Sequence, residues 1–230
     1  MINMNDKLRI YYDAEFTGLR QCTTLISIGL VSGTGSTFYA EFTDYDKTQV
    51  DDWIQQNVID KMFINKLNID DVINTGAHKT HRNNIMIKGS SYEIKHALLK
   101  WLSDEYSYTG KQIQFYTDCY AYDWVLLNNL ICEAGNALHL PNFIYYIPID
   151  LSTILQYEDL DPDISREEFI GNKNINLLKS IYPFNVLGDN CKHNSLWDAY
   201  VINKCFDGFS KVNVKVNVKG IDAYVDFYNR

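Results

Sequence analysis

The chain has 230 residues, of which 46% are hydrophobic, so it can bury one sizeable core. Its formal net charge of −8 argues against a protein that coats long nucleic acid, because such binding depends on many lysines and arginines. The five cysteines are scattered and include no CxxC pair, which indicates reduced thiols in the cytoplasm. No segment approaches the about 20 apolar residues of a membrane helix, and residues 1–6 do not resemble a signal peptide.

The N-terminal part predicts three strands joined by short turns, one that begins at Leu8 and carries Asp13 and Glu15, and two at residues 24–31 and 36–42, and therefore an antiparallel meander. Asp13 and Glu15 stand two positions apart at the end of the first strand, so their side chains project from the same face. Adjacent carboxylates on a buried strand repel each other, and a cation would neutralise them. The alternative is a frayed strand end at which both acids face water.

Residues 64–90 are polar and contain His78-Lys79-Thr80-His81-Arg82. This stretch could be a basic loop near a substrate, a zinc-binding HxxH motif or a solvated surface loop. The surface loop is favoured, because no cysteine or acidic residue stands at metal-ligand spacing from the histidines.

The remaining elements follow from apolar periodicity. The predicted helices cover residues 50–62, 92–106, 123–135, 152–157, 176–182 and 193–206, and further strands cover 112–117 and 143–151. In the first of these helices, Trp53, Val58 and Met62 fall broadly on one side. Three strands followed by alternating strands and helices predict an α/β fold with a mixed sheet, formed by a single domain over residues 1–210.

Residues 211–219 alternate strictly between valine and lysine or asparagine, which predicts a strand within a C-terminal extension of residues 211–230. This strand could add to a sheet edge, pair with another subunit or present a basic ribbon to nucleic acid. We favour a sheet edge, because lysines commonly guard exposed edges.

Two acidic residues stand near the start of the predicted helix 123–135. Asp123 opens this helix, where the helix dipole favours a negative charge. Its ordinary role would be an N-cap without any chemistry. Asp118 lies at the end of the preceding strand, and we rank it second to Asp123 as a functional candidate.

His193 and Asp198 lie near the end of the chain. On one continuous helix they would point about 140° apart and could not share a face. If Asn194 or Ser195 caps the helix, however, Asp198 lies in its first turn and His193 in the preceding loop, and both could reach one cleft. The alternative for His193 is an ordinary histidine in a surface loop.

The combination of these motifs is more specific than any one of them. Asp13-x-Glu15 followed by Thr17-Gly18-Leu19, then Asp123 at a helix start, then His193-x4-Asp198 resembles the DEDD superfamily of 3′–5′ exonucleases, in its histidine branch (DEDDh). The resemblance runs from about Leu8 to Phe206 and is greatest to small bacterial and phage exoribonucleases. One departure is Tyr120-Ala121-Tyr122, which stands where His-Asn often precedes the second motif's aspartate.

This resemblance implies an RNase H-like fold and two divalent cations, Mg²⁺ or Mn²⁺, which four oxygen-donor side chains suit. It implies that Asp13 bridges both ions, that Glu15 and Asp198 complete the site of the attacking water, and that Asp123 supports the second ion. It also implies that His193 takes the proton from that water.

The resemblance further implies that the Thr17-Gly18-Leu19 turn contacts the terminal nucleotide, with Leu19 wedged against its base. Phe16 and Tyr122 are candidates for base stacking, although a core role is favoured for each.

The implied substrate is the 3′ end of a single-stranded nucleic acid, with RNA favoured over DNA. The alternatives are a DNA-directed proofreading or repair exonuclease and a non-catalytic RNase H-like module that only binds nucleic acid. Many relatives are homodimers, and the valine-lysine tail offers an edge through which two copies could pair.

Overall fold

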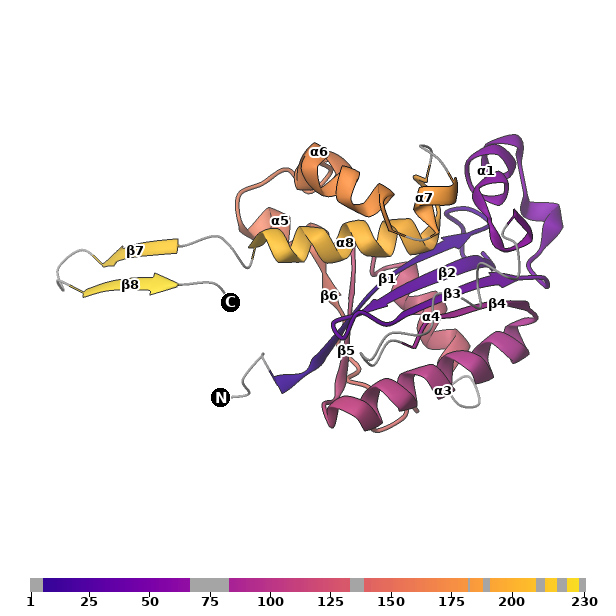
Figure 1. Cartoon of the computed structure of the whole chain (residues 1–230), viewed down its shortest axis with the longest axis horizontal. Helices are drawn as coiled ribbons and strands as arrows, with labels where there is room; N and C mark the ends of the chain where they lie inside the picture. The colour runs from indigo at the N-terminus through magenta and orange to yellow at the C-terminus, as the bar shows by residue number, and fades with distance from the viewer. Residues whose placement is uncertain are drawn as a thin grey trace.

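The structure is a computed structural model that describes residues 6–66, 83–132, 139–181, 183–187, 191–209, 214–218 and 223–227 (Figure 1). The predicted HxxH motif and most of the polar stretch around it lie outside these residues. Among the helices that the structure describes, none is both long and apolar enough to cross a membrane.

A six-stranded mixed sheet lies at the centre, with the strand order β4-β3-β2-β1-β5-β6. The strands are β1 (Leu8–Phe16), β2 (Leu25–Ser32), β3 (Thr37–Phe42), β4 (Ile85–Gly89), β5 (Ile113–Thr117) and β6 (Ile149–Asp150). The antiparallel pairs β1–β2 and β2–β3 confirm the predicted meander. All strands except β2 run in the same direction, so five carboxyl ends meet at one edge of the sheet.

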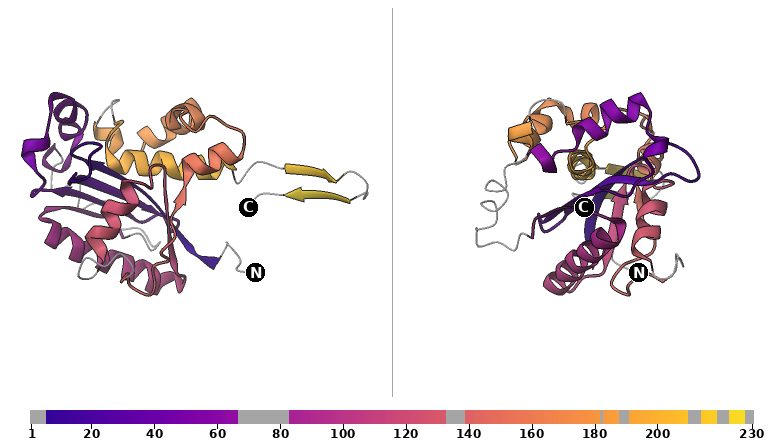
Figure 2. Two further views of the ribbon diagram at one scale, coloured as in Figure 1. Left: turned by 180° about the vertical axis from the view of Figure 1, so that it is seen from behind. Right: turned by 90° about the vertical axis from the view of Figure 1, so that its right-hand side faces the viewer.

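Helices cover both faces of this sheet (Figures 1 and 2). The α-helices are α1 (Asp52–Asn57), α3 (Ser91–Thr109), α4 (Asp123–Ile131), α5 (Leu151–Tyr157), α6 (Arg166–Lys179), α7 (Phe184–Leu187) and α8 (Ser195–Phe209). Short 3₁₀ helices lie at η2 (Lys47–Gln49), η3 (Ile59–Lys61) and η4 (Ile64–Lys66). Helices α3 and α4 pack on one face, and α5 to α8 pack on the other.

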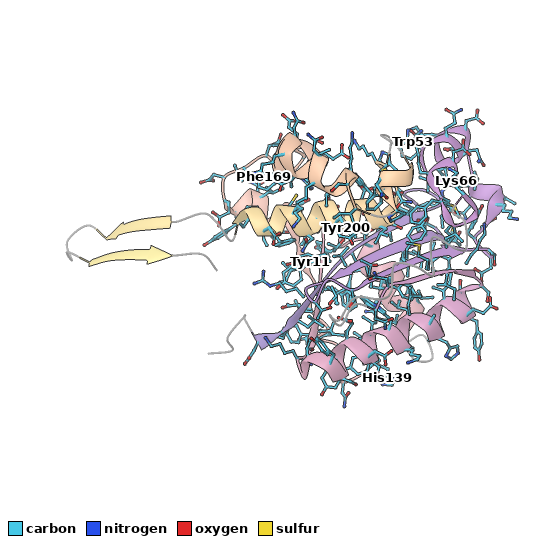
Figure 3. The ribbon with its side chains drawn as sticks, in the orientation of Figure 1. Tyr11, Trp53, Lys66, His139, Phe169 and Tyr200 are labelled. Atoms are coloured by element: carbon cyan, nitrogen blue, oxygen red, sulfur yellow. The ribbon has the colours of Figure 1, made fainter. Side chains whose placement is uncertain are left out.

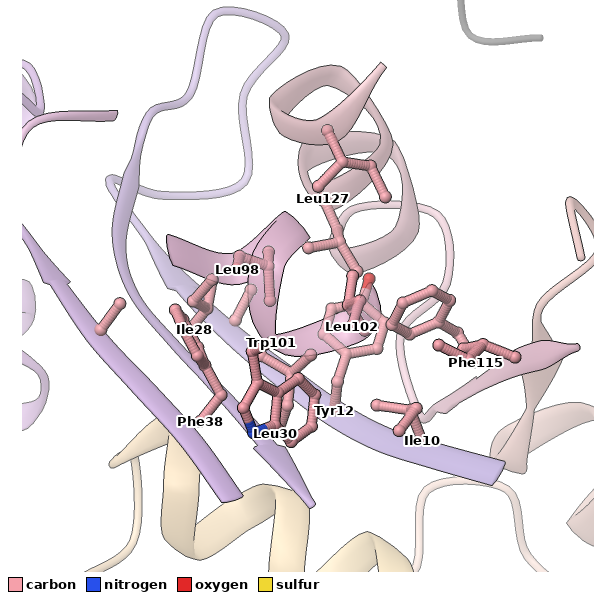
Figure 4. Packing of buried hydrophobic residues seen from close by; sticks show 14 of the residues in the cluster. Ile10, Tyr12, Ile28, Leu30, Phe38, Leu98, Trp101, Leu102, Phe115 and Leu127 are labelled. Atoms are coloured by element: carbon pink, nitrogen blue, oxygen red, sulfur yellow. The ribbon is translucent and has the colours of Figure 1, made fainter. Parts of the chain in front are cut away.

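The alternation of β1 decides which face carries the acidic pair. Ile10 and Tyr12 are fully buried against α3 and α4 (Figure 4), whereas Tyr11 packs on the opposite face, toward α8. Side chains two positions apart share a face, so Asp13 and Glu15 also lie on the α8 side of the sheet. The first predicted motif therefore faces the helix that carries the last one.

Several elements of the structure differ from the prediction. The helix expected at residues 50–62 spans only Asp52–Asn57, and Trp53 is 55% exposed while its neighbour Ile54 is buried. The strand expected at residues 143–151 is only the two-residue β6, with one isolated bridge at Ile144. Strand β4 was not predicted, because its half-buried pattern gives a weak alternation signal.

Helix α6 begins at Arg166, ten residues before the helix predicted at 176–182. The prediction missed the first part of this helix because Gly171, with a φ of 74°, interrupts the helical geometry. The interruption also breaks the apolar period on which the prediction relied.

The C-terminal residues form a second, two-stranded sheet, in which β7 (Val214–Val218) pairs with β8 (Ala223–Phe227) in antiparallel register. The alternating stretch is thus a strand, and its described partner is β8 instead of the six-stranded sheet. Strand β8 was not predicted.

Helix α8 starts unusually close to β2 at Gly29. A Cβ atom on Gly29 would lie 2.3 Å from the carbonyl carbon and oxygen of Ser195 and from the backbone nitrogen of Leu196. The hydroxyls of Ser27 and Ser195 are 3.0 Å apart beside this contact. Only glycine allows the two backbones to approach in this way, and the approach sets where α8 begins.

We expect Gly29→Ala to destabilise the protein by about 3 kcal/mol, the upper end for overpacking, because the colliding atoms belong to rigid backbone. In a chain of this size that corresponds to a melting temperature about 6–12 °C lower. Thermal melts followed by circular dichroism test this. Gly33→Ala is the matched control, since its Cβ would meet the Arg9 carbonyl oxygen at an ordinary 3.5 Å. Equal melting temperatures for the two variants would contradict the close approach.

Candidate active site

The acidic residues named from the sequence line one cavity of about 380 Å³ at the carboxyl edge of the sheet. Its walls come from the end of β1, the β5–α4 connection, the start of α6 and the start of α8. Ligands of α/β proteins generally bind outside the carboxyl ends of the strands, and this cavity occupies such a position.

Two groups of side chains within this cavity could each hold a metal ion. In the first group, ligand atoms of Glu15, His193 and Asp198 lie within 4.8 Å of one another. In the second group, carboxylate oxygens of Asp13 and Asp123 lie within the same distance of one another and of Asp118. All five residues predicted to be catalytic are therefore brought together.

The start of α8 follows the predicted capping arrangement. The Asn194 side-chain oxygen accepts hydrogen bonds from the backbone N–H groups of Leu196 and Trp197, at 3.2 and 3.3 Å, and so caps the helix. Asp198 lies in the first turn, and its Oδ2 accepts a hydrogen bond from the His193 backbone N–H at 2.9 Å. His193 has a φ of 64°, a left-handed conformation that few residues other than glycine adopt.

Asp123 occupies the first position of α4 and is only 2% exposed. It does not cap the helix, because the N-cap is Tyr122, which makes no side-chain cap. Instead its Oδ2 accepts a 2.6 Å hydrogen bond from the hydroxyl of the buried Thr117. The ordinary N-cap interpretation was therefore wrong, and the carboxylate is turned into the cavity beside Asp13.

Asp118, which the sequence ranks second to Asp123, lies in the second group as well. Its Oδ2 forms an ion pair with Nε of Arg166 at 2.7 Å, which fixes the carboxylate in the second group. Arg166 also donates to the Ser152 hydroxyl and to two backbone carbonyls, so it is held on several sides. The available signal was the position of Asp118 directly after a buried strand, at the edge where Asp13 and Glu15 also end.

The four predicted metal ligands repel one another strongly. Burial raises the pKa of Asp13 well above its ordinary value, and the neighbouring Asp123 and Glu15 raise it further. The pKa values of Glu15, Asp123 and Asp198 are also raised, in each case chiefly by burial. Asp13 Oδ2 is buried and has no hydrogen-bond partner among the described residues. A buried carboxylate oxygen without a partner is costly, so the arrangement fits cation binding.

The surroundings of His193 lower its pKa, through burial first and then through the positive charges of Lys192 and Lys61. Its imidazole is therefore neutral at pH 7 and able to accept a proton. The ring contacts the edge of Trp53, with ring centroids 5.3 Å apart and the planes at 69° (Figure 3 labels Trp53). Sequence reasoning missed this contact, because an exposed aromatic residue on a short helix gives no sign of its neighbour.

The turn after β1 is anchored at Thr17. This residue is fully buried, and its hydroxyl donates to Gln49 Oε1 at 2.8 Å and accepts from the Thr24 backbone N–H at 2.9 Å. Gly18 has a φ of 114°, and the adjacent Leu19 is 76% exposed. Thr17 therefore holds the turn internally, while Leu19 projects into solvent.

Phe16 and Tyr122 stack on each other, with ring centroids 5.3 Å apart and planes inclined by 11°. Both rings are half-buried, and Phe16 lines the cavity. The pair links the end of β1 to the start of α4, the two elements that carry Asp13 and Asp123.

Known proteins similar to this chain point to one family. Two curated proteins of Mycobacterium tuberculosis, the 3′-5′ exoribonucleases Rv2179c and MT2234.1, are each 34% identical to it over 55 residues. This match spans 24% of the chain and 33% of each relative. A solved structure described as 3′-end specific recognition of histone mRNA stem-loop by 3′-exonuclease shares the fold, with a TM-score of 0.50 and 12% identity, covering 97% of this chain and 72% of that one.

The family model of the Rv2179c-like 3′-5′ exoribonuclease domain matches residues 8–208. The match begins with β1, includes every carboxylate of the cavity and ends one residue before the end of α8. The chain therefore belongs to the Rv2179c-like 3′-5′ exoribonuclease domain family.

Proposed function

We propose that this protein is a 3′–5′ exoribonuclease that hydrolyses the terminal phosphodiester bond of single-stranded RNA with two divalent cations. The observation that carries the proposal is the pair of adjoining carboxylate groups, one of which contains the buried and unpartnered Asp13 Oδ2. His193 stands beside the first group with a lowered pKa. Membership of the exoribonuclease domain family supports RNA over DNA as the substrate.

The donor set suits Mg²⁺ or Mn²⁺. The proposed ligands Asp13, Glu15, Asp123 and Asp198 supply only carboxylate oxygens, which hard cations prefer over the sulfur and nitrogen ligands typical of zinc. Cations would also stabilise the charged forms of all four groups, whose pKa values are raised by burial first and then by neighbouring carboxylates. When bound, such ions lower the pKa of an attacking water and stabilise the leaving oxygen.

The chain's own residues would then orient the reaction. Glu15 and Asp198 hold one side of the cavity, where the imidazole of His193 accepts the proton of the attacking water at a ring nitrogen. Asp13 and Asp123 hold the other side, and the Thr117 hydroxyl fixes the Asp123 carboxylate.

We further propose that the turn at Thr17-Gly18-Leu19 receives the terminal nucleotide. The exposed Leu19 supplies an apolar surface for a base, whereas the buried Thr17 positions the turn through Gln49. The Phe16–Tyr122 stack supplies an aromatic surface at the cavity wall.

The biological setting is also proposed. All five cysteines are free, which fits a reducing, cytoplasmic location. The compact part, residues 1–210, would act as one exonuclease domain, and the strands of the C-terminal sheet offer edges to which a second copy could add. The molar mass in solution, measured by light scattering, decides between a monomer and a homodimer.

We expect the purified protein with Mn²⁺ or Mg²⁺ to shorten a 5′-labelled single-stranded RNA one nucleotide at a time. Denaturing gels should show a ladder of products that descends from the full-length substrate, and EDTA should abolish it. A matched DNA oligonucleotide should be degraded more slowly. Cleavage that begins inside the strand, or that persists in EDTA, would contradict the proposed function.

A further inference from the structure

A second cavity, of about 560 Å³, lies at the carboxyl ends of β3 and β4. It is therefore on the same edge of the sheet as the candidate active site, which lies at the ends of β1 and β5. Three lysines, Lys47, Lys66 and Lys88, line it against two carboxylates, Asp60 and the buried Glu41.

The strand register gives the distance between the two cavities. Glu15 of β1 pairs with Ser27 of β2, Ser27 with Glu41 of β3, and Glu41 with Lys88 of β4. These four residues form one row across the sheet and share the face that packs against α8. With neighbouring strands about 4.8 Å apart, the backbone at Glu41 lies about 10 Å from Glu15 and the backbone at Lys88 about 14 Å. A few nucleotides of an extended strand cover this separation.

The lysines differ in how firmly they are held. Lys88 Nζ forms an ion pair with Glu41 Oε2 at 3.5 Å. The other carboxylate oxygen, Glu41 Oε1, accepts hydrogen bonds from the backbone N–H groups of Phe63 and Ile64. Lys66 Nζ donates to the Asp60 carbonyl. Lys47 is exposed and has no side-chain hydrogen bond or ion pair within the described part of the chain, so it can contact a ligand without breaking one.

The opposite side of the active site is acidic. The connection from α5 into α6, residues 158–168, carries six acidic residues and only one basic residue. That basic residue, Arg166, is already bonded to Asp118, to Ser152 and to two backbone carbonyls. Figure 3 shows Lys66 and Phe169, which lies on α6, on opposite sides of the compact part of the molecule. A polyanion that extends from the active site is therefore repelled on the α6 side, whereas the cavity on the other side has three lysines against two carboxylates.

We propose that the lysine-lined cavity binds the phosphodiester backbone of the nucleotides that lie 5′ of the cleaved bond. The inference rests on the proposed exonuclease function and adds the path of the substrate. In an acidic protein, this cluster would supply the local positive charge that binding of a single strand requires. Neutralising Lys47 and Lys66 should weaken the binding of long oligonucleotides and not that of dinucleotides.

The test measures binding without hydrolysis, in full-length protein carrying Asp13→Asn. Fluorescence anisotropy with 5′-fluorescein-labelled oligouridylates of two and eight nucleotides is recorded from 0.05 to 0.3 M salt, with AMP as a further ligand. Lys47→Gln with Lys66→Gln should weaken octamer binding about 10- to 30-fold near 0.1 M salt, because each phosphate contact contributes about 0.7 to the salt slope. The slope itself should fall by about 1.4, and binding of the dinucleotide and of AMP should not change.

Lys100→Gln with Lys111→Gln is the matched control. It removes the same two positive charges, from the exposed Lys100 of α3 and from Lys111 just beyond this helix, on the opposite face of the sheet. The salt slope for octamer binding should stay unchanged in this control variant. Circular dichroism melts verify that both double variants fold. An unchanged octamer slope in the Lys47 and Lys66 variant, or an equal loss for dinucleotide and octamer, would overturn the subsite. Because binding is measured apart from cleavage, a wild-type protein that cleaves no RNA would overturn the proposed function separately.

Discussion

Asp13→Asn is expected to abolish RNA hydrolysis while making the metal-free protein more stable. The substitution removes a ligand from the proposed two-cation site, whose contribution of several kcal/mol corresponds to a loss of about 10³-fold or more in rate. In the metal-free protein the same substitution removes one of several like charges buried together. Each kcal/mol of relieved repulsion should raise the melting temperature by about 2–4 °C.

The pH dependence of stability provides a second readout of the Asp13→Asn prediction. The folded-state pKa values of Asp13, Glu15, Asp123 and Asp198 are all raised, so the folded protein binds protons more tightly than the unfolded chain. Their contribution to stability is then fully present below the unfolded value of about 4 and is lost as the pH rises through the folded values. The metal-free wild type should lose stability along this range, and Asp13→Asn should lose less.

Asp104→Asn is the control for this experiment. Asp104 lies on α3 and pairs with the exposed Lys100, so its substitution should change neither the rate nor the melting temperature appreciably. A metal-free Asp13→Asn protein that melts below the wild type would show that Asp13 stabilises the fold, contrary to the electrostatic argument.

The second large effect is expected for His193→Asn, which should slow hydrolysis by about 10²–10⁴-fold, the usual contribution of a general base. Asparagine is chosen because it tolerates the left-handed conformation at this position, with its φ of 64°. The substitution also retains the backbone N–H of residue 193, which donates a hydrogen bond to the Asp198 carboxylate. Single-turnover rates at saturating Mn²⁺ measure the loss.

The concentration of Mn²⁺ distinguishes two roles for His193, because its ring also lies within 4.8 Å of Glu15 and Asp198. If the imidazole serves as a base, the rate of the variant stays low at every Mn²⁺ concentration. Recovery of the rate at high Mn²⁺ would show that it serves as a metal ligand. Trp53→Phe is the comparison, because it keeps an aromatic neighbour for the imidazole and should cost far less.

Local patterns accounted for the strands that carry the first motif and for the cap that separates His193 from Asp198. In both cases the information is contained in a few adjacent residues: alternation decides the face of β1, and an asparagine followed by an apolar run decides where α8 begins. The arrangement of Asp13, Asp123 and Asp198 around one cavity then followed from motif order and the family resemblance.

Interactions between distant segments could not be predicted in this way. The ion pair between Asp118 and Arg166 joins residues 48 positions apart, and Arg166 belongs to a helix whose period is interrupted at Gly171. The contact between Trp53 and His193 likewise depends on how α1 docks, which no local pattern encodes. The lysine-lined cavity arises only when β3 and β4 pair in parallel.

The left-handed backbone at His193 affects how the proposed site would bind cations. Because the His193 N–H already orients the Asp198 carboxylate, the conformational entropy of arranging this ligand is lost during folding and not during binding. Such a preorganised site rearranges little when ions enter, so the heat of Mn²⁺ binding would mainly report the exchange of water ligands for carboxylates. The left-handed residue would thus shift part of the entropic cost of the proposed metal binding into the folding of the protein.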